Sequence, residues 1–270
     1  MSTFLFSGPV FGPVHSRRLG NSLGINLLPV DGKVCSFDCV YCECGFNADT
    51  RPKSRLPTRA ETAEKLEARL RRYAEEGVRI DALTFAGNGE PTAHPEFPEI
   101  IEDAIAIRDR WMPGAAVCVL TNAVNILKPR VAAALTRIEK PMLKLDSVDP
   151  DYVRLVNRPQ CRVDIPKLVE AMVKLKGKCI IQTMFIKGSV DGRPIDNTAD
   201  SFVLPWIEAL KKIQPAEVSI YSLDRDVPCP TVLSASAEDL RRIGRLVEAA
   251  GIRAVVSAER SEVEREKEKD

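Results

Sequence analysis

The sequence predicts an α/β fold, a partly open (β/α)6-type TIM-like barrel of parallel strands. Short apolar runs rich in β-branched residues alternate with longer segments of helical periodicity, at about the 30-residue spacing of one βα unit. Such alternation requires right-handed crossovers and therefore parallel strands. Six full units and a last strand are fewer than the eight units that close a barrel, and a doubly wound open sheet is the alternative.

Seven segments are expected to form the strands of this sheet. Each is short, apolar and bounded by charged residues or by turn-forming residues, as strands buried in a parallel sheet are. We expect strands at 24–28, 82–86, 116–120, 142–146, 179–185, 217–221 and 252–256. Only the first gap between strands is much longer than the others, and it contains a cysteine-rich loop.

The helices between these strands carry their own start signals. Thr58 and Ser236 each precede a run of helical periodicity and are followed three positions later by an acidic residue, which is a capping box. Asp164 is the expected N-cap of a third helix. Because proline breaks helical hydrogen bonding, Pro205 predicts that the helix around 206–213 is kinked or begins later.

The composition is that of a globular protein, with 44% hydrophobic and 29% charged residues. Lys and Arg number 39 against 38 Asp and Glu, and this balance argues against an obligate binder of polyanions. The longest uncharged stretch, 111–127, contains Pro, Gly and Asn and is not expected to span a membrane.

We expect a single core domain over residues 1–258 and a charged tail over 259–270. Ten of the twelve residues of that tail are charged, which is typical of a solvated extension. The first residues show no basic start leading into an apolar run, as a signal peptide would. A cytoplasmic location, where thiols stay reduced, is therefore expected.

Four of the eight cysteines, Cys35, Cys39, Cys42 and Cys44, lie within ten residues. In a reducing compartment such clustering points to metal binding or chemistry rather than to disulfides. The first three thiolates, spaced four and three apart, can converge on one soft metal centre, and a [4Fe–4S] cluster held by three cysteines keeps one iron open for chemistry. The alternatives are a structural zinc that uses Cys44 as fourth ligand and a loop without metal.

Cys35-x3-Cys39-x2-Cys42, with the aromatic Tyr41 before the last cysteine, resembles the signature of the radical SAM superfamily. Residues 8–45 resemble a small subfamily related to the wyosine tRNA-base synthases. This resemblance implies a [4Fe–4S] cluster on the three cysteines, with S-adenosyl-L-methionine (SAM) bound at the open iron. It further implies that an electron from the cluster cleaves SAM and that the resulting 5′-deoxyadenosyl radical abstracts hydrogen from a substrate.

The same resemblance predicts SAM-binding residues at the carboxyl ends of the other strands, where such barrels place their sites. The loop Gly87-Asn88-Gly89-Glu90 resembles the superfamily's Gly-Gly-Glu motif, and a tight strand-to-helix turn is the alternative interpretation. The further candidates for cofactor binding are Tyr41, Thr121, Asn122, Lys144, Asp146, Gln182, Met184 and Tyr221. A structural salt bridge is the alternative for the Lys144 and Asp146 pair, and core packing is the alternative for Met184.

Other residues carry weaker signals. Arg17, Arg18 and Arg158 resemble subfamily hallmarks and would suit a carboxylate or phosphate on the substrate, with surface salt bridges as the alternative. His15 and His94 are interpreted as structural residues rather than bases. Three further thiols, Cys44, Cys161 and Cys229, are placed at the active-site rim. We expect them to form no second cluster, and we expect Cys44 to lie near the first cluster without ligating it.

The favoured function is an oxygen-sensitive radical SAM enzyme of oxidoreductase or lyase type, acting on an unidentified substrate. Its electron donor would be a flavodoxin or a ferredoxin, and no membrane partner is expected. A tRNA-base-modifying enzyme is the named alternative, but the neutral charge and the lack of a basic RNA-binding segment count against nucleic acid. A non-catalytic iron–sulfur electron carrier and a zinc-stabilised interaction module are the alternatives from other classes.

Overall fold

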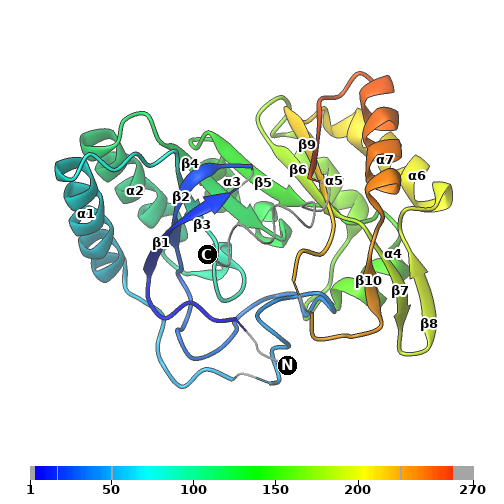
Figure 1. Ribbon diagram of the computed structural model, residues 1–270, viewed down its shortest axis with the longest axis horizontal. Helices are drawn as coiled ribbons and strands as arrows, with labels where there is room; N and C mark the ends of the chain where they lie inside the picture. The colour runs from blue at the N-terminus through cyan, green and yellow to red at the C-terminus, as the bar shows by residue number, and fades with distance from the viewer. Residues whose placement is uncertain (1–3, 17, 50, 226, 258–270) are drawn as a thin grey trace, which may run out of the picture.

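The protein is represented by a computed structural model, which describes residues 4–16, 18–49, 51–225 and 227–257. Its main feature is one curled eight-stranded sheet, in the order β1-β2-β3-β4-β5-β6-β9-β11 (Figure 1). The strands are β1 (Val10–Ser16), β2 (Gly20–Ile25), β3 (Ala82–Phe85), β4 (Ala116–Thr121), β5 (Lys140–Lys144), β6 (Ile180–Met184), β9 (Glu217–Tyr221) and β11 (Ala254–Ser257).

The strands from β2 onward are parallel, and only β1 pairs antiparallel to its neighbour. This topology confirms the prediction of a partly open parallel barrel, because β1 and β11 are the two unjoined edges of the curled sheet. The seven parallel strands correspond to the seven expected segments, although β2 and β5 begin and end earlier than predicted. After Ile25 the side chain of Asn26 hydrogen-bonds with both backbone groups of Leu28, so the chain leaves the sheet there.

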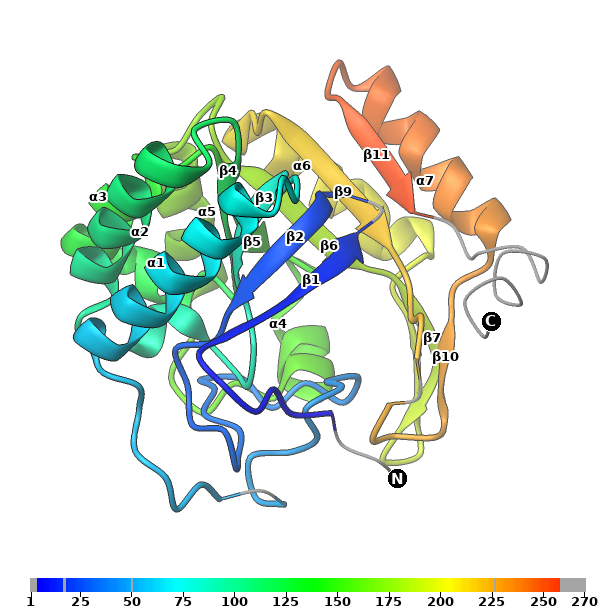
Figure 2. The same ribbon diagram turned by 60° about the vertical axis from the view of Figure 1, so that its left-hand side comes forward.

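Helices cover the outer, convex face of the sheet, as Figure 2 shows. The long helices are α1 (Arg59–Glu75), α2 (Phe97–Trp111), α3 (Pro129–Leu135), α5 (Ile165–Val173), α6 (Asp200–Ile213) and α7 (Ala237–Ala249). Short turns of helix are η1 (Pro91–Ala93), η2 (Val124–Leu127), α4 (Pro150–Tyr152) and the π-helical η3 (Val153–Asn157). No helix in the described ranges is both long enough and apolar enough to cross a membrane.

The predicted helix starts are confirmed. Thr58 and Ser236 each form a complete capping box, and the Asp164 carboxylate accepts a hydrogen bond from the N–H of Lys167. The prediction of a later start near Pro205 is wrong, because α6 begins at Asp200 and contains the proline. Pro205 lies on the exposed side of the helix. Solvent can there hydrogen-bond the backbone carbonyl that receives no N–H from the proline, so the missing hydrogen bond costs least.

The main core lies between the sheet and the helices, and a smaller cluster fills the inside of the barrel. That inner cluster contains Leu19, Ala82, Cys118, Met142 and Ile180 at the amino-terminal ends of the strands. Towards the carboxyl ends the inner surface becomes polar, with Thr121 at the end of β4 donating a 2.6 Å hydrogen bond to Glu90. The inner apolar layer therefore closes one end of the barrel and leaves the other end for polar chemistry.

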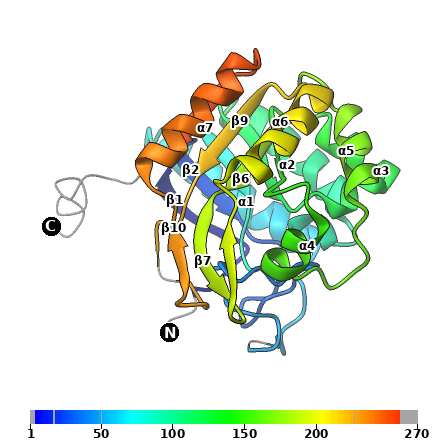
Figure 3. The same cartoon turned by 90° about the vertical axis from the view of Figure 1, so that its right-hand side faces the viewer.

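A small second sheet, in the order β10-β7-β8, was not predicted. Its strands are β7 (Ile186–Val190), β8 (Arg193–Asp196) and β10 (Val232–Ser234). Figure 3 shows β7 and β10 side by side, with β7 continuing from the carboxyl end of β6. Only Phe185 separates β6 from β7, so the sequence shows one apolar run where the structure has two strands in different sheets. The predicted charged tail, 259–270, lies outside the described residues.

Candidate functional site

The cysteine-rich loop follows β2 and lies at the carboxyl ends of the parallel strands (Figures 1 and 2). Backbone hydrogen bonds join it to two other segments. Val34 pairs with Gly89 in a parallel bridge, in which the Val34 N–H donates to Asn88 O and the Glu90 N–H donates to Val34 O. On its other side the N–H of Val40 donates to Val156 O in η3. The loop has little regular structure of its own, yet it is fixed between two neighbours.

The two glycines of the Gly87–Glu90 segment are required by this close packing. A Cβ on Gly89 would lie 1.9 Å from Val34 O, and a Cβ on Gly87 would lie 2.3 Å from Oδ1 of Asn26. Both residues also have positive φ, 149° for Gly87 and 135° for Gly89, where other residues are strained. The tight-turn interpretation therefore describes the local role of these glycines, and their backbone also lines the cysteine loop.

The Asn88 side chain is fully occupied by the protein. Its Nδ2 donates to Phe6 O and Pro29 O at 3.0 and 2.8 Å, and its Oδ1 accepts from the Phe6 N–H at 2.8 Å. The residue is completely buried. We therefore assign its amide to holding the amino-terminal segment in place, and the cofactor-binding role of Asn88 stays a prediction.

Glu90 joins this loop to the end of β4. Its carboxylate accepts hydrogen bonds from the Thr121 hydroxyl at 2.6 Å and from the Asn122 N–H at 2.7 Å, and also from Thr92. Burial raises the pKa of the carboxyl while these donors lower it, and the net shift is upward. The Asn122 amide reaches the cysteine loop, where Nδ2 donates to Ser36 Oγ at 2.8 Å. Three predicted site residues thus form one connected unit.

Each of the three predicted cluster ligands has a polar neighbour that favours its thiolate form. The Phe37 N–H and the Asn122 amide lie 3.4 and 3.7 Å from Cys35 Sγ, and Asn157 Nδ2 lies 3.5 Å from Cys39 Sγ. Burial raises the pKa of Cys35 and Cys39. A hydrogen bond from Cys44 lowers the pKa of Cys42 to about 6, with attraction from Lys33 contributing to the shift.

These features suit an iron–sulfur cluster better than zinc. Among the described residues no three His, Cys, Asp or Glu side chains converge on a point where a single metal ion could sit. A four-iron cluster has a different requirement, because each cysteine ligates a different iron at its own corner of the cluster. The buried thiol of Cys39 and the half-buried thiols of Cys35 and Cys42 fit such a centre, because N–H groups lie near the sulfurs of Cys35 and Cys39 and hydrogen bonds to sulfur tune iron–sulfur clusters.

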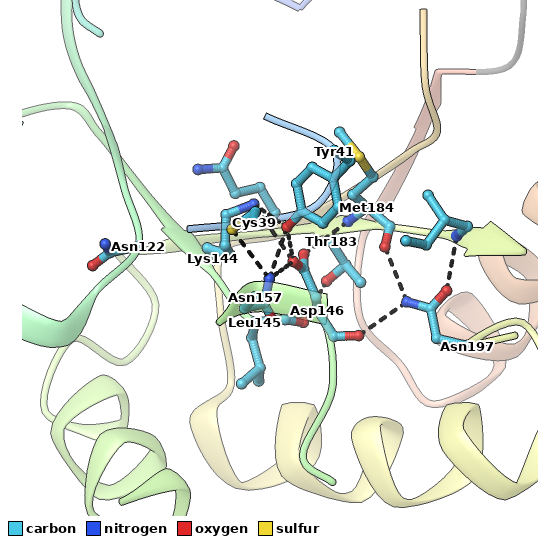
Figure 4. A network of polar contacts seen from close by, with 12 residues as sticks. Cys39, Tyr41, Asn122, Lys144, Leu145, Asp146, Asn157, Thr183, Met184 and Asn197 are labelled. Atoms are coloured by element: carbon cyan, nitrogen blue, oxygen red, sulfur yellow. Dashed lines mark hydrogen bonds and ion pairs between the residues drawn. The ribbon is translucent and has the colours of Figure 1, made fainter. Parts of the chain in front are cut away.

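A second polar network lies beside the cysteines and is drawn in Figure 4. Asp146 is its centre. The Asp146 carboxylate accepts from the Tyr41 hydroxyl, from Asn157 Nδ2 at 2.8 Å and from the Met184 N–H at 3.0 Å. Lys144 Nζ donates to the Tyr41 hydroxyl at 2.9 Å and lies 3.5 Å from Asp146. Burial alone would lower the Lys144 pKa, but attraction to Asp146 and the neighbouring thiols raises it.

The remaining candidates differ in position. Gln182 is buried and its amide donates to Met142 O at 3.2 Å inside the barrel, so its amide nitrogen is engaged by the backbone. Met184 and Tyr221 line a cavity of about 290 Å³ together with Tyr41 and Arg18. Arg158 forms a 2.8 Å ion pair with Asp191, which is the surface salt bridge considered as its alternative. Arg17 lies outside the described residues.

The structural interpretation of His94 agrees with its contacts. Its Nδ1 accepts from the Glu96 N–H and its Nε2 lies 2.9 Å from Pro57 O, so both ring nitrogens are engaged by the backbone. The three thiols expected at the rim have no neighbour in common. Cys44 donates to Gly87 O at 3.5 Å, Cys229 contacts Thr231, and Cys161 is exposed. The sequence analysis proposed that Cys44 lies beside the cluster without ligating it, and this remains a prediction.

Two buried residues of the site were not identified from sequence. Lys33 is 3% exposed, and its Nζ donates to Asp38 Oδ1 at 2.9 Å and to Gly45 O at 2.8 Å. Asn197 bridges β5 and β6 to β7 through Asp146 O, Met184 O and the Ile186 N–H. The position of Lys33, two residues before Cys35, could have indicated a positive charge beside the cluster. Asn197 gave none, because its role depends on the unpredicted β7–β8 hairpin.

Comparison with known proteins identifies this arrangement. Residues 30–201 match the family model described as "Radical SAM superfamily". The chain is 30% identical to a UPF0026 protein of Synechocystis sp. over 81% of this chain and 77% of the relative, and 30% identical to one of Helicobacter pylori over 80% and 66%. It spans from 33% to 66% of the length of several other curated relatives that it matches.

Solved structures share the fold at low identity. A radical SAM methyltransferase from Sphaerobacter thermophilus has a TM-score of 0.62 at 19% identity, over 89% of this chain and 67% of that one. A TYW1 structure with a lysine-pyruvate adduct has a TM-score of 0.55 at 16% identity, over 84% and 73%. Radical SAM enzymes use a [4Fe–4S] cluster and SAM, and the cysteine and glycine motifs of this chain lie within the matched range. The chain therefore belongs to the radical SAM superfamily.

Proposed function

We propose that this protein is a radical SAM enzyme whose [4Fe–4S] cluster is ligated by Cys35, Cys39 and Cys42. When bound, the cluster supplies one electron to SAM, which breaks into methionine and a 5′-deoxyadenosyl radical that takes a hydrogen atom from the substrate. One observation carries the proposal: the bridge between Val34 and Gly89, which joins the three-cysteine loop to the Gly87–Glu90 loop. The two segments that the chemistry requires are thereby held against each other.

The residues of the site then divide into two groups. The Gly87–Glu90 segment, through its backbone carbonyls and the Glu90 carboxylate, would hold the amino group of SAM. Thr121 and Asn122 are fixed by Glu90 and would face the methionine carboxylate or the ribose. Burial of this unit excludes water, since Glu90 and Thr121 are 2% and 3% exposed.

Tyr41, Lys144 and Asp146 form the second group and would hold the adenosine end of SAM. Their network fixes the Tyr41 ring, with Lys144 Nζ 4.9 Å from the ring centroid. Met184 supplies an apolar, polarisable surface to the adenine, and Gln182 lies deeper in the barrel. This group would position the cofactor.

The reaction is of oxidoreductase or lyase type on an unidentified substrate, and a flavodoxin or ferredoxin supplies the electron. Both kinds of donor are small redox proteins, so each would need to dock only near the cysteine loop to pass an electron to the cluster. Two cysteines of that loop, Cys35 and Cys42, are of intermediate exposure and would form the face through which the electron enters, whereas Cys39 is buried. Electron entry through this face would not disturb the cavity beside Tyr41.

The test is anaerobic reconstitution with iron and sulfide, followed by reduction in the presence of SAM. The wild-type protein should show cluster absorbance and should form 5′-deoxyadenosine. Alanine at any one of Cys35, Cys39 or Cys42 should abolish both, because three thiolates are needed to hold the cluster. Cys161→Ala is the matched control, since this thiol is exposed and lies on a different loop.

Two results would contradict the proposal. A triple alanine variant that kept its cluster and formed 5′-deoxyadenosine would remove the three cysteines from the site. A wild-type protein with a normal cluster and no SAM binding would instead be an iron–sulfur electron carrier.

A further inference from the structure

The geometry points to Arg18 as the anion-binding residue of a substrate cavity at the open end of the barrel, for a small molecule that carries a carboxylate or a phosphate. This inference rests on the proposed function, because it places the substrate beside the residues that would hold SAM. The cavity has a volume of about 290 Å³. That size is at the lower end for small-molecule sites and suits a metabolite.

Arg18 is positioned by contacts that bridge the inside of the barrel. It lies between β1 and β2, and its guanidinium reaches across to β9, where Nη1 donates to Ser219 Oγ at 3.3 Å. Its Cζ lies 4.7 Å from the centroid of the Tyr221 ring. A guanidinium held over an aromatic ring gains a cation–π contact that leaves its N–H donors available to an anion.

The charge of Arg18 is not balanced by a carboxylate in the described part of the chain. Two other arginines that are not fully exposed are paired with carboxylates, Arg108 with Glu139 and Arg158 with Asp191, whereas the half-buried Arg69 donates to Gly12 O and to the Tyr73 hydroxyl. Placing a partly buried guanidinium against only a hydroxyl and a ring costs free energy unless an anion binds it. A ligand carboxylate or phosphate would supply two acceptors in the geometry that the guanidinium fork prefers.

The other charged groups of the cavity do not replace that anion. Arg225 and Glu43 neutralise each other through a 2.8 Å ion pair. His15 lies at the exposed rim, and Asp224 is engaged in an interaction of its own. Among the described residues that line the cavity, Arg18 is thus the positively charged group available to bind an anionic ligand.

The opposite wall of the cavity connects it to the cofactor residues. Tyr41 and Met184 line the cavity and also belong to the network around Asp146. None of the three cluster cysteines lines it. A substrate held by its anionic group at Arg18 would therefore extend towards the adenosine end of SAM, where hydrogen abstraction takes place.

The experiment uses the reconstituted protein with SAM bound, under anaerobic conditions, and matched pairs of charged and neutral probes. Glycerol 3-phosphate is compared with glycerol, and succinate with succinamide, by ligand-observed saturation-transfer NMR and by calorimetry. We expect at least one charged probe to bind and both neutral probes to fail. The pair that shows binding distinguishes a phosphate from a carboxylate as the preferred group.

Arg18→Gln should weaken binding of the charged probe by about 10- to 100-fold, because a charge-assisted bidentate contact is lost. The probe affinity of Arg18→Lys should lie between that of the wild type and that of Arg18→Gln, since lysine keeps the positive charge but cannot make the bidentate contact of a guanidinium. Arg158→Gln is the control and should bind the probe as the wild type does, because Arg158 is paired with Asp191 on the surface.

Cluster absorbance and SAM affinity are measured on every variant and separate this inference from the proposed function. Normal cluster and SAM binding with no binding of any charged probe, or with unchanged probe binding in Arg18→Gln, would overturn the anion site alone. Probe binding that depends on Arg18 in a protein unable to cleave SAM would retain the anion site and refute the proposed function. If Arg18→Gln fails to fold, Arg18→Lys decides, and wild-type affinity in that variant counts against the site.

Discussion

At the scale of single residues, the site depends on a few buried charges and the groups that balance them. Asp146 accepts hydrogen bonds at both carboxylate oxygens, and Glu90 accepts them from two segments of the chain. Lys33 is buried beside the cysteine thiols and is held by Asp38. A buried charge without such partners would be costly, so each of these residues has both a structural and a chemical consequence.

Glu90 and Asp146 allow the first prediction. Glu90→Ala and Asp146→Ala should keep the cluster but weaken SAM binding by about 10- to 150-fold, the effect of losing a charged hydrogen-bond partner worth about 1.5–3 kcal/mol. Calorimetry with SAM measures this. Glu90→Gln is the matched control because it keeps the shape and one acceptor for Thr121. Unchanged affinity in both alanine variants would remove these residues from the SAM site.

Lys33 supports a prediction about the cluster itself. Its positive charge interacts with the thiols of Cys42 and Cys35 and should stabilise the more negative, reduced cluster. Lys33→Met should therefore lower the reduction potential by about 50–100 mV, from a screened interaction of roughly 1–2 kcal/mol. A redox titration followed by electron paramagnetic resonance measures this potential.

The control for Lys33 is Lys53→Met, which removes an exposed lysine of a more distant part of the same loop. Because Lys33→Met also leaves Asp38 without its partner, the double variant Lys33→Met/Asp38→Asn tests the charge with less disturbance of the fold. An unchanged potential in both Lys33 variants would show that the lysine serves only to hold the loop.

At the scale of elements, the cysteine loop is ordered by its neighbours rather than by its own hydrogen bonds. The Gly87–Glu90 segment holds one side through the Val34–Gly89 bridge, and η3 holds the other side through Val40 and Asp38. The π-helical turn of η3 ends at Asn157, whose side chain reaches Cys39, Tyr41 and Asp146. Such π-helical turns often occur at functional sites, and this one brings the amide to the centre of the network.

The bridge at Gly89 leads to a prediction for the element scale. Gly89→Ala should destabilise the fold by about 1–3 kcal/mol and reduce cluster assembly, because the new methyl group would overlap Val34 O and the backbone has positive φ. Thermal unfolding and iron content measure the two effects. Gly114→Ala is the control, since a Cβ there meets no atom within 4 Å. Equal stability and iron content in the two variants would show that the bridge does not hold the loop.

At the scale of the whole molecule, the curled sheet brings the segments that follow β2, β3, β4, β5, β6 and β9 to one end and leaves its edges, β1 and β11, unjoined. The amino-terminal end is filled by the apolar cluster around Met142 and Ile180. The carboxyl end carries the cysteines, the polar networks and the cavity beside Arg18. One face of the barrel therefore contains all the proposed chemistry, as in other barrels of parallel strands.

This arrangement predicts a single cluster. The wild-type protein should contain about four irons per chain, the content of one [4Fe–4S] cluster, and the triple variant of Cys35, Cys39 and Cys42 should contain almost none. The double variant Cys161→Ala/Cys229→Ala should keep the wild-type iron content, because these thiols lie on separate loops. About four irons per chain in the triple variant would reveal a second cluster that uses the other cysteines.

The sequence by itself determined where the parallel strands lie along the chain, the helix starts at Thr58, Asp164 and Ser236, and the three-cysteine motif. These features depend on local periodicity, capping and spacing, which a single stretch of chain contains. The sequence also indicated Asp146, because a charged residue in an apolar strand must meet a polar environment, and it indicated Glu90 through the resemblance to the Gly-Gly-Glu motif.

The tertiary structure alone decided which groups meet. Asn88 was expected to contact the cofactor but is occupied by Phe6 and Pro29, and the role of Lys33 depends on Asp38 and Gly45. The contact of Arg18 with Ser219 joins residues 201 positions apart, and no local pattern records such a pair. Hydrogen bonds between distant segments form only once the sheet has curled. Which charged side chain remains available to a ligand, here Arg18, is therefore decided by the folded chain.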